Sequence, residues 1–296
     1  MTIIHLKDVT KRYKKQVVIN EVNLKIERPG IWALVGPNGV GKTTLLNCIC
    51  NIVPISSGTI TLLGKSHRSY HVFKQIAFLQ DNSILFHYLT GYDHLKYVAD
   101  SHQVPKSNML EVAEYLGMSN YLFKRVEDYS LGMKQHLLVA LSLINKPKLL
   151  LMDEPLNGLD PTSAILIRNI LLDLVKQGTT VILSSHNLAE IDRVTNQIIF
   201  LKNGKLFEVN RSDYLTTRYL FKVSNAKKAK KVLTEARYQV NDSAHNLDIE
   251  ISEQDLDQCI KHIHNSNITI LDIQKQVSSS EALYQDYYSE VMKGAH

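Results

Sequence analysis

The sequence has few cysteines and no pattern of paired ones. Its 296 residues include three cysteines, Cys48, Cys50 and Cys259, an odd and sparse set. Such a set argues against a disulfide framework and favours a reducing compartment. Cys48 and Cys50 have the spacing C-x-C, but no second pair lies nearby and both fall in an apolar helical run. We therefore interpret them as core residues rather than metal ligands.

Long apolar segments are also lacking. The N-terminal stretch MTIIHLKDVTKRYKK has no charged head followed by a long apolar run, so we find no secretion signal. The longest apolar candidate is LLVALSLI at 137–144, well short of the roughly 18–20 residues that span a bilayer. We expect that this chain does not cross a membrane by itself.

The chain has no strong excess of one charge. Its formal net charge is only +5, and the lysines are scattered. The one dense basic patch is AKKAKK at 226–231, which is typical of the solvated polar face of a short helix. We therefore expect no nucleic-acid partner.

Strand and helix patterns alternate over the first two thirds of the chain. Residues 31–36 read IWALVG, a continuous apolar run typical of a buried parallel strand, and a helix is predicted from Lys42 to about Ile52. Residues 92–145 are mostly helical in period, with breaks around Pro105, Gly117 and Ser130. The remaining predictions are strands at 148–153 and 179–184, helices at 161–177 and 187–194, and a tight hairpin at Asn203–Gly204. This alternation predicts a mainly parallel α/β sheet.

The pattern changes after about residue 215. The order there is strand, helix, strand pair, helix, strand, which suits a small α+β domain of the split βαβ type. We expect two domains, 1–215 and 216–296, and find no catalytic cluster in the second.

Residues 36–44 read GPNGVGKTT and match the phosphate-binding pattern G-x-x-x-x-G-K-[ST] between a strand and a helix. Glycines let backbone N–H groups turn toward phosphate oxygens, and the helix offers its positive end. Lys42 is placed to reach the β and γ phosphates, and the Thr43 hydroxyl can ligate Mg²⁺. The predicted phosphate-binding residues are Gly36, Pro37, Asn38, Gly39, Val40, Gly41, Lys42, Thr43 and Thr44.

A phosphate-binding loop of this kind needs a carboxylate for its metal ion. The stretch KLLLMDEP at 148–155 places Asp153 at the tip of a buried strand, where ligands bind in open α/β sheets. Glu154 follows directly and is free to polarise a water in line with the γ-phosphate. Asp153 is therefore predicted to bind the metal, and Glu154 to act in catalysis.

The stretch YSLGMKQH at 129–136 completes a resemblance to the nucleotide-binding subunit of an ATP-binding-cassette (ABC) transporter. By themselves, Ser130 and Gly132 predict the start of a helix. The resemblance implies that they form the signature motif of that family, whose helix N-terminus faces the γ-phosphate held by the other subunit.

Four further residues match this family in order along the chain. The resemblance implies that Tyr13 stacks on adenine, that Gln80 contacts Mg²⁺ and the attacking water, and that Asp160 ends a loop crossing the dimer. It also implies that His186, in ILSSH, contacts the γ-phosphate. The catalytic residues implied are Glu154, His186 and Gln80, and the metal-binding residues are Thr43, Gln80 and Asp153.

The signature motif departs from the usual L-S-G-G-Q. Tyr129, Leu131 and Met133 replace its first, third and fifth residues, while Ser130 and Gly132 remain. The variant resembles that of exporters related to the bacitracin- and lantibiotic-resistance systems of Gram-positive bacteria. Asn157–Gly158 replaces a more usual Ser-Ala or Thr-Ala pair and leaves Asp160 intact.

The resemblance implies an α/β fold, a P-loop NTPase core with antiparallel β and helical subdomains, followed by the small C-terminal α+β domain. It implies an ATP- and Mg²⁺-dependent ATPase that drives an exporter through separate membrane-spanning subunits. The cargo that the resemblance favours is an antimicrobial or toxic peptide. Because one chain holds one P-loop and one signature, two such chains, or this one and a paralogue, must pair. The implied location is the cytoplasmic face of the membrane, as a peripheral subunit.

Three alternatives remain open from the sequence. An importer subunit has the same motifs. A soluble ATPase acting on ribosomes or DNA usually carries two cassettes or long coiled-coil insertions, and neither is present. A binding module without turnover is disfavoured because Glu154 and His186 are both intact.

Overall fold

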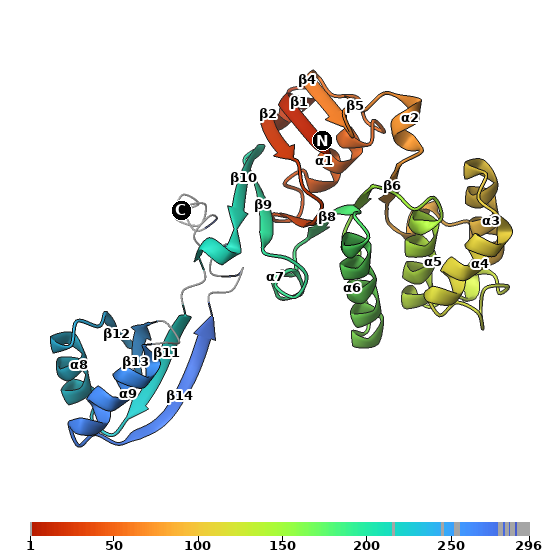
Figure 1. Cartoon of the computed structure of the whole chain (residues 1–296). Coiled ribbons are helices and arrows are strands. Elements are labelled where there is room, and N and C mark those ends of the chain that lie inside the picture. The colour runs from red at the N-terminus through yellow and green to blue at the C-terminus, as the bar shows by residue number, and fades with distance from the viewer. Residues whose placement is uncertain are drawn as a thin grey trace. The chain divides into compact units, whose positions relative to one another are not determined.

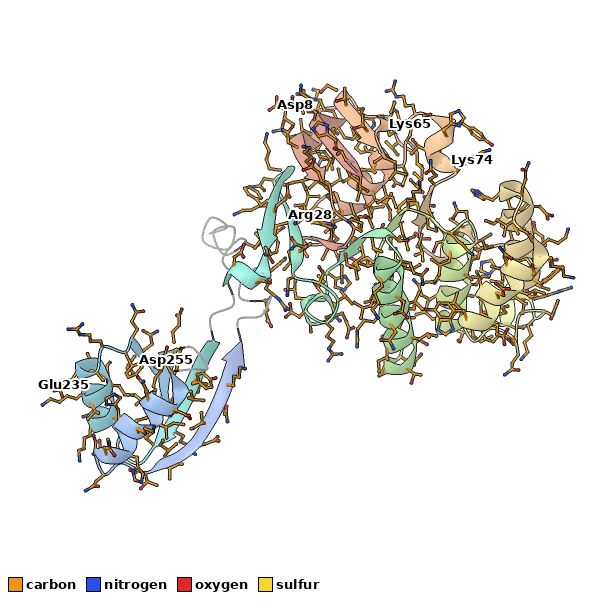
Figure 2. All side chains as sticks on the ribbon, in the orientation of Figure 1. Asp8, Arg28, Lys65, Lys74, Glu235 and Asp255 are labelled. Atoms are coloured by element: carbon orange, nitrogen blue, oxygen red, sulfur yellow. The ribbon has the colours of Figure 1, made fainter. Side chains whose placement is uncertain are left out.

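The computed structural model describes residues 2–214, 217–243, 246–251 and 255–277, together with residues 281, 284 and 288. The chain divides into two compact units, Met1–Val209 and Asn210–His296. Each unit has its own cluster of buried apolar side chains. Charged side chains such as Asp8, Lys65 and Glu235 are exposed on the outside of their units (Figure 2).

Two sheets form the frame of the first unit (Figure 1). The antiparallel sheet has the order β2-β1-β4-β5, with bounds β1 Ile4–Tyr13, β2 Gln16–Ile26, β4 Ser57–Leu62 and β5 Lys65–Ser66. The second sheet has six strands in the order β10-β9-β3-β8-β7-β6. Their bounds are β3 Ile31–Val35, β6 Ile76–Leu79, β7 Leu149–Met152, β8 Thr180–Ser185, β9 Gln197–Lys202 and β10 Lys205–Asn210.

The centre of the six-stranded sheet is parallel, as the sequence predicts. β3 pairs in parallel with β8 and β9, and β7 pairs in parallel with β6 and β8. Every residue of β7 and β8 is buried, which explains their continuous apolar sequences. The carboxyl ends of β3, β6, β7 and β8 therefore meet at one edge, and the loops that follow them carry the predicted motifs.

The helices follow the predicted breaks, with differences at their ends. Helices α3 (Gly91–His102), α4 (Lys106–Tyr115) and α5 (Leu131–Leu143) contact one another and form a helical group in Figure 1. The others in this unit are α1 Lys42–Ile49, α2 Tyr70–Phe73, α6 Pro161–Lys176 and α7 Leu188–Ile191, with short 3-10 turns η1 Asn82–Ile84 and η2 Val126–Asp128. A further 3-10 turn, η3 Arg211–Tyr214, belongs to the second unit.

Two predicted helices are shorter than expected. The helix predicted to reach Ile52 ends at Ile49, because Asn51 has a left-handed backbone with φ of 54°. The helix predicted at 187–194 is the single turn α7. The Asn203–Gly204 hairpin is confirmed: both residues have positive φ, 50° and 73°, as a tight turn of this kind requires.

The second unit has the predicted order of elements. β11 Thr217–Val223 is followed by α8 Ala226–Glu235, β12 Val240–Ser243, β13 Asn246–Glu250, α9 Leu256–Asn265 and β14 Ile270–Val277. Its antiparallel sheet has the order β12-β13-β11-β14, the arrangement of a split βαβ fold. The AKKAKK stretch is confirmed as a short helix that buries Ala229 and Leu233 and exposes Lys227, Lys228 and Lys231.

The three cysteines are free and buried, which confirms the core positions predicted for Cys48 and Cys50. Burial raises the pKa of the Cys48 thiol to about 11 and that of Cys50 to about 12, so neither is a ready thiolate. Among the residues with defined positions, no cluster of three His, Cys, Asp or Glu side chains could hold a metal ion. Over the same residues, every helix is too short or too polar to span a bilayer.

Candidate nucleotide-binding site

The glycine-rich loop lies between β3 and α1, where the sequence predicts it. Its backbone needs glycine at two positions: Gly39 has φ of 79° and Gly41 has φ of 113°. A Cβ at Gly41 would also lie 2.8 Å from Val18 Cγ1. Asn38 is exposed, whereas Val40 and Thr44 are partly buried. The loop is thus an open turn that leads directly into the N-terminus of α1.

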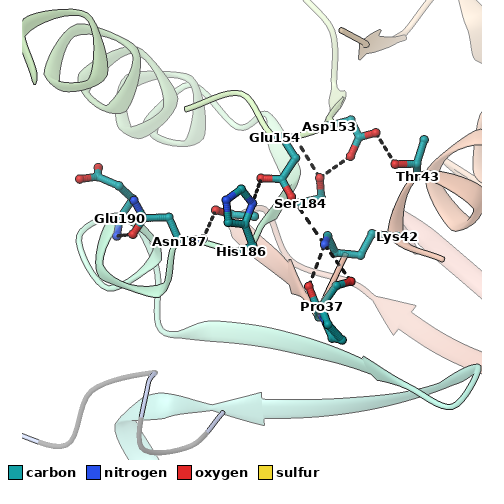
Figure 3. Close-up of polar contacts among 11 residues, drawn as sticks. Pro37, Lys42, Thr43, Asp153, Glu154, Ser184, His186, Asn187 and Glu190 are labelled. Atoms are coloured by element: carbon teal, nitrogen blue, oxygen red, sulfur yellow. Dashed lines mark hydrogen bonds and ion pairs between the residues drawn. The ribbon is translucent and has the colours of Figure 1, made fainter. Parts of the chain in front are cut away.

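Lys42 is the buried cation of this loop, with 6% of its surface exposed. Its Nζ donates hydrogen bonds to Gly36 O at 2.7 Å and to Pro37 O at 3.4 Å. The same Nζ lies 3.5 Å from Glu154 Oε1 (Figure 3). The loop carbonyls therefore hold the ammonium group at the mouth of the loop, facing the acidic residues that follow β7.

Asp153 connects the loop to two strands. Its Oδ2 accepts a hydrogen bond of 2.6 Å from the Thr43 hydroxyl, and its Oδ1 accepts one of 2.5 Å from the Ser184 hydroxyl. The Asp153 backbone N–H donates to Leu79 O, the residue before Gln80. Gln80 is partly buried and follows β6 directly. A hydroxyl, a carboxylate and an amide oxygen are the hard donors that Mg²⁺ prefers, so these residues fit that ion.

Glu154 has the backbone conformation that turns its side chain away from that of Asp153. Its φ is 49°, and its backbone N–H donates to the Ser184 hydroxyl at 2.9 Å. Its carboxylate contacts Lys42 through Oε1 and His186 Nδ1 through Oε2, the latter at 2.8 Å (Figure 3). Glu154 therefore lies between a fixed cation and an imidazole, a suitable place for a general base.

The predicted signature motif starts a helix, as expected. Ser130 is the N-cap of α5, and its Oγ accepts a hydrogen bond of 3.2 Å from Met133 N. A Cβ at Gly132 would lie 3.1 Å from Ser163 Oγ and 3.5 Å from Asp160 Oδ2. The N-termini of α5 and α6 are thus close neighbours, and this close approach favours glycine at 132.

Asp160 is the N-cap of α6. Its Oδ1 accepts hydrogen bonds from Thr162 N at 2.9 Å and Ser163 N at 3.1 Å. Hydrogen bonds from the Ser163 side chain and backbone hold the pKa of Asp160 below its usual value. The carboxylate is therefore ionised at neutral pH and complements the positive end of α6.

The predicted residues form two groups. Lys42, Thr43, Asp153, Glu154 and His186 are joined by the contacts described above. Ser130, Gly132 and Asp160 form the second group, and in the described chain no hydrogen bond or ion pair joins them directly to the first. Tyr13 stands apart at the end of β1: the residue is 45% exposed, with Lys11 Nζ 4.6 Å from the ring centroid.

Two residues that organise the site were not predicted from the sequence. Ser184 binds both Asp153 and the backbone of Glu154, and it is fully buried. Gln135 of α5 donates from Nε2 to Pro155 O at 2.8 Å and so connects the signature helix to the turn after Glu154. The signal for Ser184 was available, since a hydroxyl at a buried position of the apolar strand TVILSS needs a partner.

Comparisons with known proteins find relatives over most of the chain. A family model described as "ABC transporter" matches residues 19–157. The bacitracin transport ATP-binding protein BcrA of Enterococcus faecalis is 32% identical, over 99% of this chain and 97% of that protein. The lantibiotic transport ATP-binding protein SrtF of Streptococcus pyogenes is 35% identical, over 69% of this chain and 89% of that protein. A solved structure titled as the ATP-binding subunit of an ABC transporter has a TM-score of 0.66 at 24% identity, covering 71% of this chain and 91% of that one.

Proposed function

Because the chain belongs to the family of ABC transporter ATP-binding proteins, whose members hydrolyse ATP and work with membrane-spanning subunits, we propose that it drives a peptide exporter. The observation that carries this proposal is the full-length similarity to a bacitracin transport ATP-binding protein, which includes the second unit. The shorter match to a lantibiotic transport protein supports the same class of cargo, an antimicrobial or toxic peptide. The chain then acts as a peripheral subunit at the cytoplasmic face of the membrane, without nucleic acid.

We assign ATP binding to the residues around the loop. Backbone N–H groups of residues 36–44, except Pro37, which has none, would surround the phosphates, and Lys42 would bind the β and γ phosphates. The carbonyls of Gly36 and Pro37 already hold its ammonium group in place, which limits the entropy lost on binding. Tyr13 is exposed, and we assign it to stacking on adenine, which contributes about 1–3 kcal/mol where a base stacks on an aromatic ring.

Magnesium binding is assigned to Thr43, Asp153 and Gln80. When bound, Mg²⁺ neutralises charge on the β and γ phosphates. The contribution of the protein is placement: Ser184 orients the Asp153 carboxylate, and the Thr43 hydroxyl lies within 2.6 Å of it.

Hydrolysis is assigned to Glu154 acting as the general base. Its carboxylate takes the proton of the attacking water, and His186 orients it by donating from Nδ1 to Oε2. Gln80 contributes a second contact to that water. The other ring nitrogen of His186, Nε2, is assigned to the γ-phosphate. The turn at Glu154, held by Ser184, separates this carboxylate from the metal-binding one.

The second half of each site comes from a partner chain in this proposal. Ser130 is exposed at the positive end of α5, and its group is not bonded to the phosphate loop of its own chain. A homodimer, or a heterodimer with a paralogue, would then hold two ATP molecules between phosphate loops and signature helices, with Asp160 beside the junction.

The test is to purify the chain with its membrane-spanning subunits, reconstitute the complex in vesicles and measure ATPase activity. Candidate cargo would comprise bacitracin, a lantibiotic, an unrelated linear peptide and a small hydrophobic drug. We expect stimulation by an antimicrobial peptide and ATP-dependent movement of that peptide away from the side that holds the ATPase. Stimulation only by an extracytoplasmic binding protein would show an importer and refute the proposal.

A further inference from the structure

His186 lies at the start of a short segment that packs its apolar residue Ile191 into the unit. α7 follows it directly and is a single turn, Leu188–Ile191. A helix of one turn is not stable by itself, because nucleation costs more than one turn of hydrogen bonds returns. Asn187 caps it through a hydrogen bond from Glu190 N to Asn187 Oδ1 at 3.3 Å, but this contact is internal to the segment. Contacts with the rest of the unit must therefore fix the place of α7.

Glu190 supplies such a contact. Its Oε2 accepts a hydrogen bond of 2.7 Å from Arg168 Nη2, and the two side chains are only 15% and 17% exposed. Arg168 belongs to α6, a helix of 16 residues whose apolar face is buried. A short ion pair in this setting, away from bulk water, is held more strongly than one on an open surface. Glu190 therefore fastens the short α7 to the long α6.

A second ion pair of Glu190, with Arg193, can be compared with the Arg168 pair. Glu190 Oε1 accepts a hydrogen bond of 3.1 Å from Arg193 Nη1. Arg193 lies only three residues along the same segment and is 59% exposed. This pair cannot fix α7 to another element, and exposure weakens it. Arg168 and Arg193 thus differ in what they connect, although both bind one carboxylate.

The catalytic group that this contact can position is His186, which precedes α7 in the chain. Its side chain is 45% exposed, and its Nδ1 bonds Glu154 Oε2 at 2.8 Å. The imidazole is thus placed mainly by its backbone, at the junction between β8 and α7. We propose that the Arg168–Glu190 ion pair is a positioning pair that keeps His186 within reach of Glu154. This inference rests on the proposed function of His186. Since Asp160 is the N-cap of α6, the same pair connects the helix that follows the Asp160 loop to the segment that follows the histidine.

The test is a double-mutant cycle in the full-length chain with its proposed partners, measuring ATP affinity and kcat separately. The variants are Glu190→Gln, His186→Ala and both together. Because a small misplacement of a catalytic group costs up to about 100-fold, we expect Glu190→Gln to lower kcat by roughly 10- to 100-fold with unchanged ATP affinity. In the His186→Ala background the same change should lower kcat by less than about twofold, since the group that it positions is already gone.

Matched arginine variants complete the test. Arg168→Gln should reproduce the loss in kcat, Arg168→Lys should restore part of it, and Arg193→Gln should stay near wild type. Thermal unfolding checks that each variant is folded. If the Glu190 and His186 effects multiply independently, or if Arg193→Gln matches Arg168→Gln, the positioning role is refuted. If His186→Ala alone is fully active, the histidine assignment falls and this inference falls with it. If His186→Ala is slow while Glu190→Gln is normal, the inference alone falls.

Discussion

The Thr43 hydroxyl donates a 2.6 Å hydrogen bond to Asp153, a residue 110 positions later in the chain. The contact arises because β3 and β7 both pair with β8, so their carboxyl ends open toward the same edge. Thr43 reaches this edge through the loop that follows β3, and Asp153 reaches it directly after β7. The metal-binding part of the site is therefore a property of the sheet order.

Replacing Lys42 with Ala should abolish nucleotide binding. Lys42 is the cation that the loop carbonyls hold at the site, and hydrogen bonds between charged groups are among the strongest single contacts. We expect ATP affinity to fall by at least about 100-fold in equilibrium titration, as loss of two such contacts predicts. Lys65→Ala, on the exposed β5, is the control and should bind normally. Near-normal affinity of the Lys42 variant would refute the phosphate-loop assignment.

Glu154→Gln should separate binding from turnover. The amide keeps the shape of the side chain but cannot take a proton, so hydrolysis should fall by roughly 10²- to 10⁴-fold. ATP binding should persist, and the ATP-bound dimer should accumulate. Size-exclusion chromatography with light scattering would detect that dimer. Full activity of the variant would assign the base to another residue.

Ser130→Arg should affect pairing rather than binding. Ser130 is exposed and makes no bond to the phosphate loop, so ATP affinity of the monomer should stay within roughly twofold, as for other surface changes. The bulky cation should block ATP-driven pairing and thereby hydrolysis. Ser107→Arg, in the exposed first turn of α4, is the control.

Mixing Ser130→Arg with Lys42→Ala protein gives a sharper result if the chain pairs with itself. One composite site would then have an intact phosphate loop and an intact signature, and some ATPase activity should return. Loss of monomer ATP binding in Ser130→Arg, as severe as in Lys42→Ala, would mean that both motifs serve the same-chain site. The two-chain arrangement would then be wrong.

Residues from about 216 onward should be dispensable for the chemistry. All the assigned residues come earlier, and the second unit has a separate core. We propose that 1–215 and 216–296 are separate domains, and that the second serves dimer contact or regulation. A chain ending at Leu215 should fold and bind ATP with the affinity of the full chain, measured by titration. A folded truncated chain that cannot bind ATP would contradict this.

Stability should fall in mild acid through His67. This side chain is 3% exposed, its Nδ1 contacts Ile60 O at 3.1 Å, and burial lowers its pKa below 6.5. Below about pH 6.5 the unfolded chain binds the proton more readily than the folded one, so the free energy of unfolding decreases as pH falls. One such group contributes at most about 1.4 kcal/mol per pH unit.

His67→Asn is the matched variant, because its amide can still donate to Ile60 O but does not titrate. Urea unfolding at pH 7.5 and pH 5.5 should show a smaller difference for the variant than for wild type. The pKa of His136 is also lowered by burial, and this effect is present in both proteins. Subtracting the pH-dependent change in unfolding free energy of the variant from that of wild type therefore isolates the effect of His67. Equal pH dependence in both proteins would refute the assignment.

Short-range patterns predicted much of this structure. The glycine spacing at 36–44, the strand before Asp153 and the order of elements after residue 215 are local signals. The structure has a turn between β3 and α1 at the first, the strand β7 at the second and the predicted order of strands and helices at the third. Contacts between distant segments were harder to predict. The hydrogen bond of Gln135 to Pro155 and the ion pair of Arg168 with Glu190 depend on how α5, α6 and α7 pack, and no spacing in the sequence encodes that. The positive φ of Glu154 was likewise not predictable, since most residue types there would avoid it.

The strand order of the large sheet also constrains how the chain is made. β3 is synthesised early, but its partners β8 and β9 emerge only after most of the first unit has left the ribosome. Until then, the apolar segment IWALV has neither neighbour, and an unpaired apolar strand is prone to aggregate. Nascent chains that stop before about residue 200 should therefore depend on chaperones. Expression yield should respond to substitutions that slow translation between β3 and β9, even where the finished protein is unaffected.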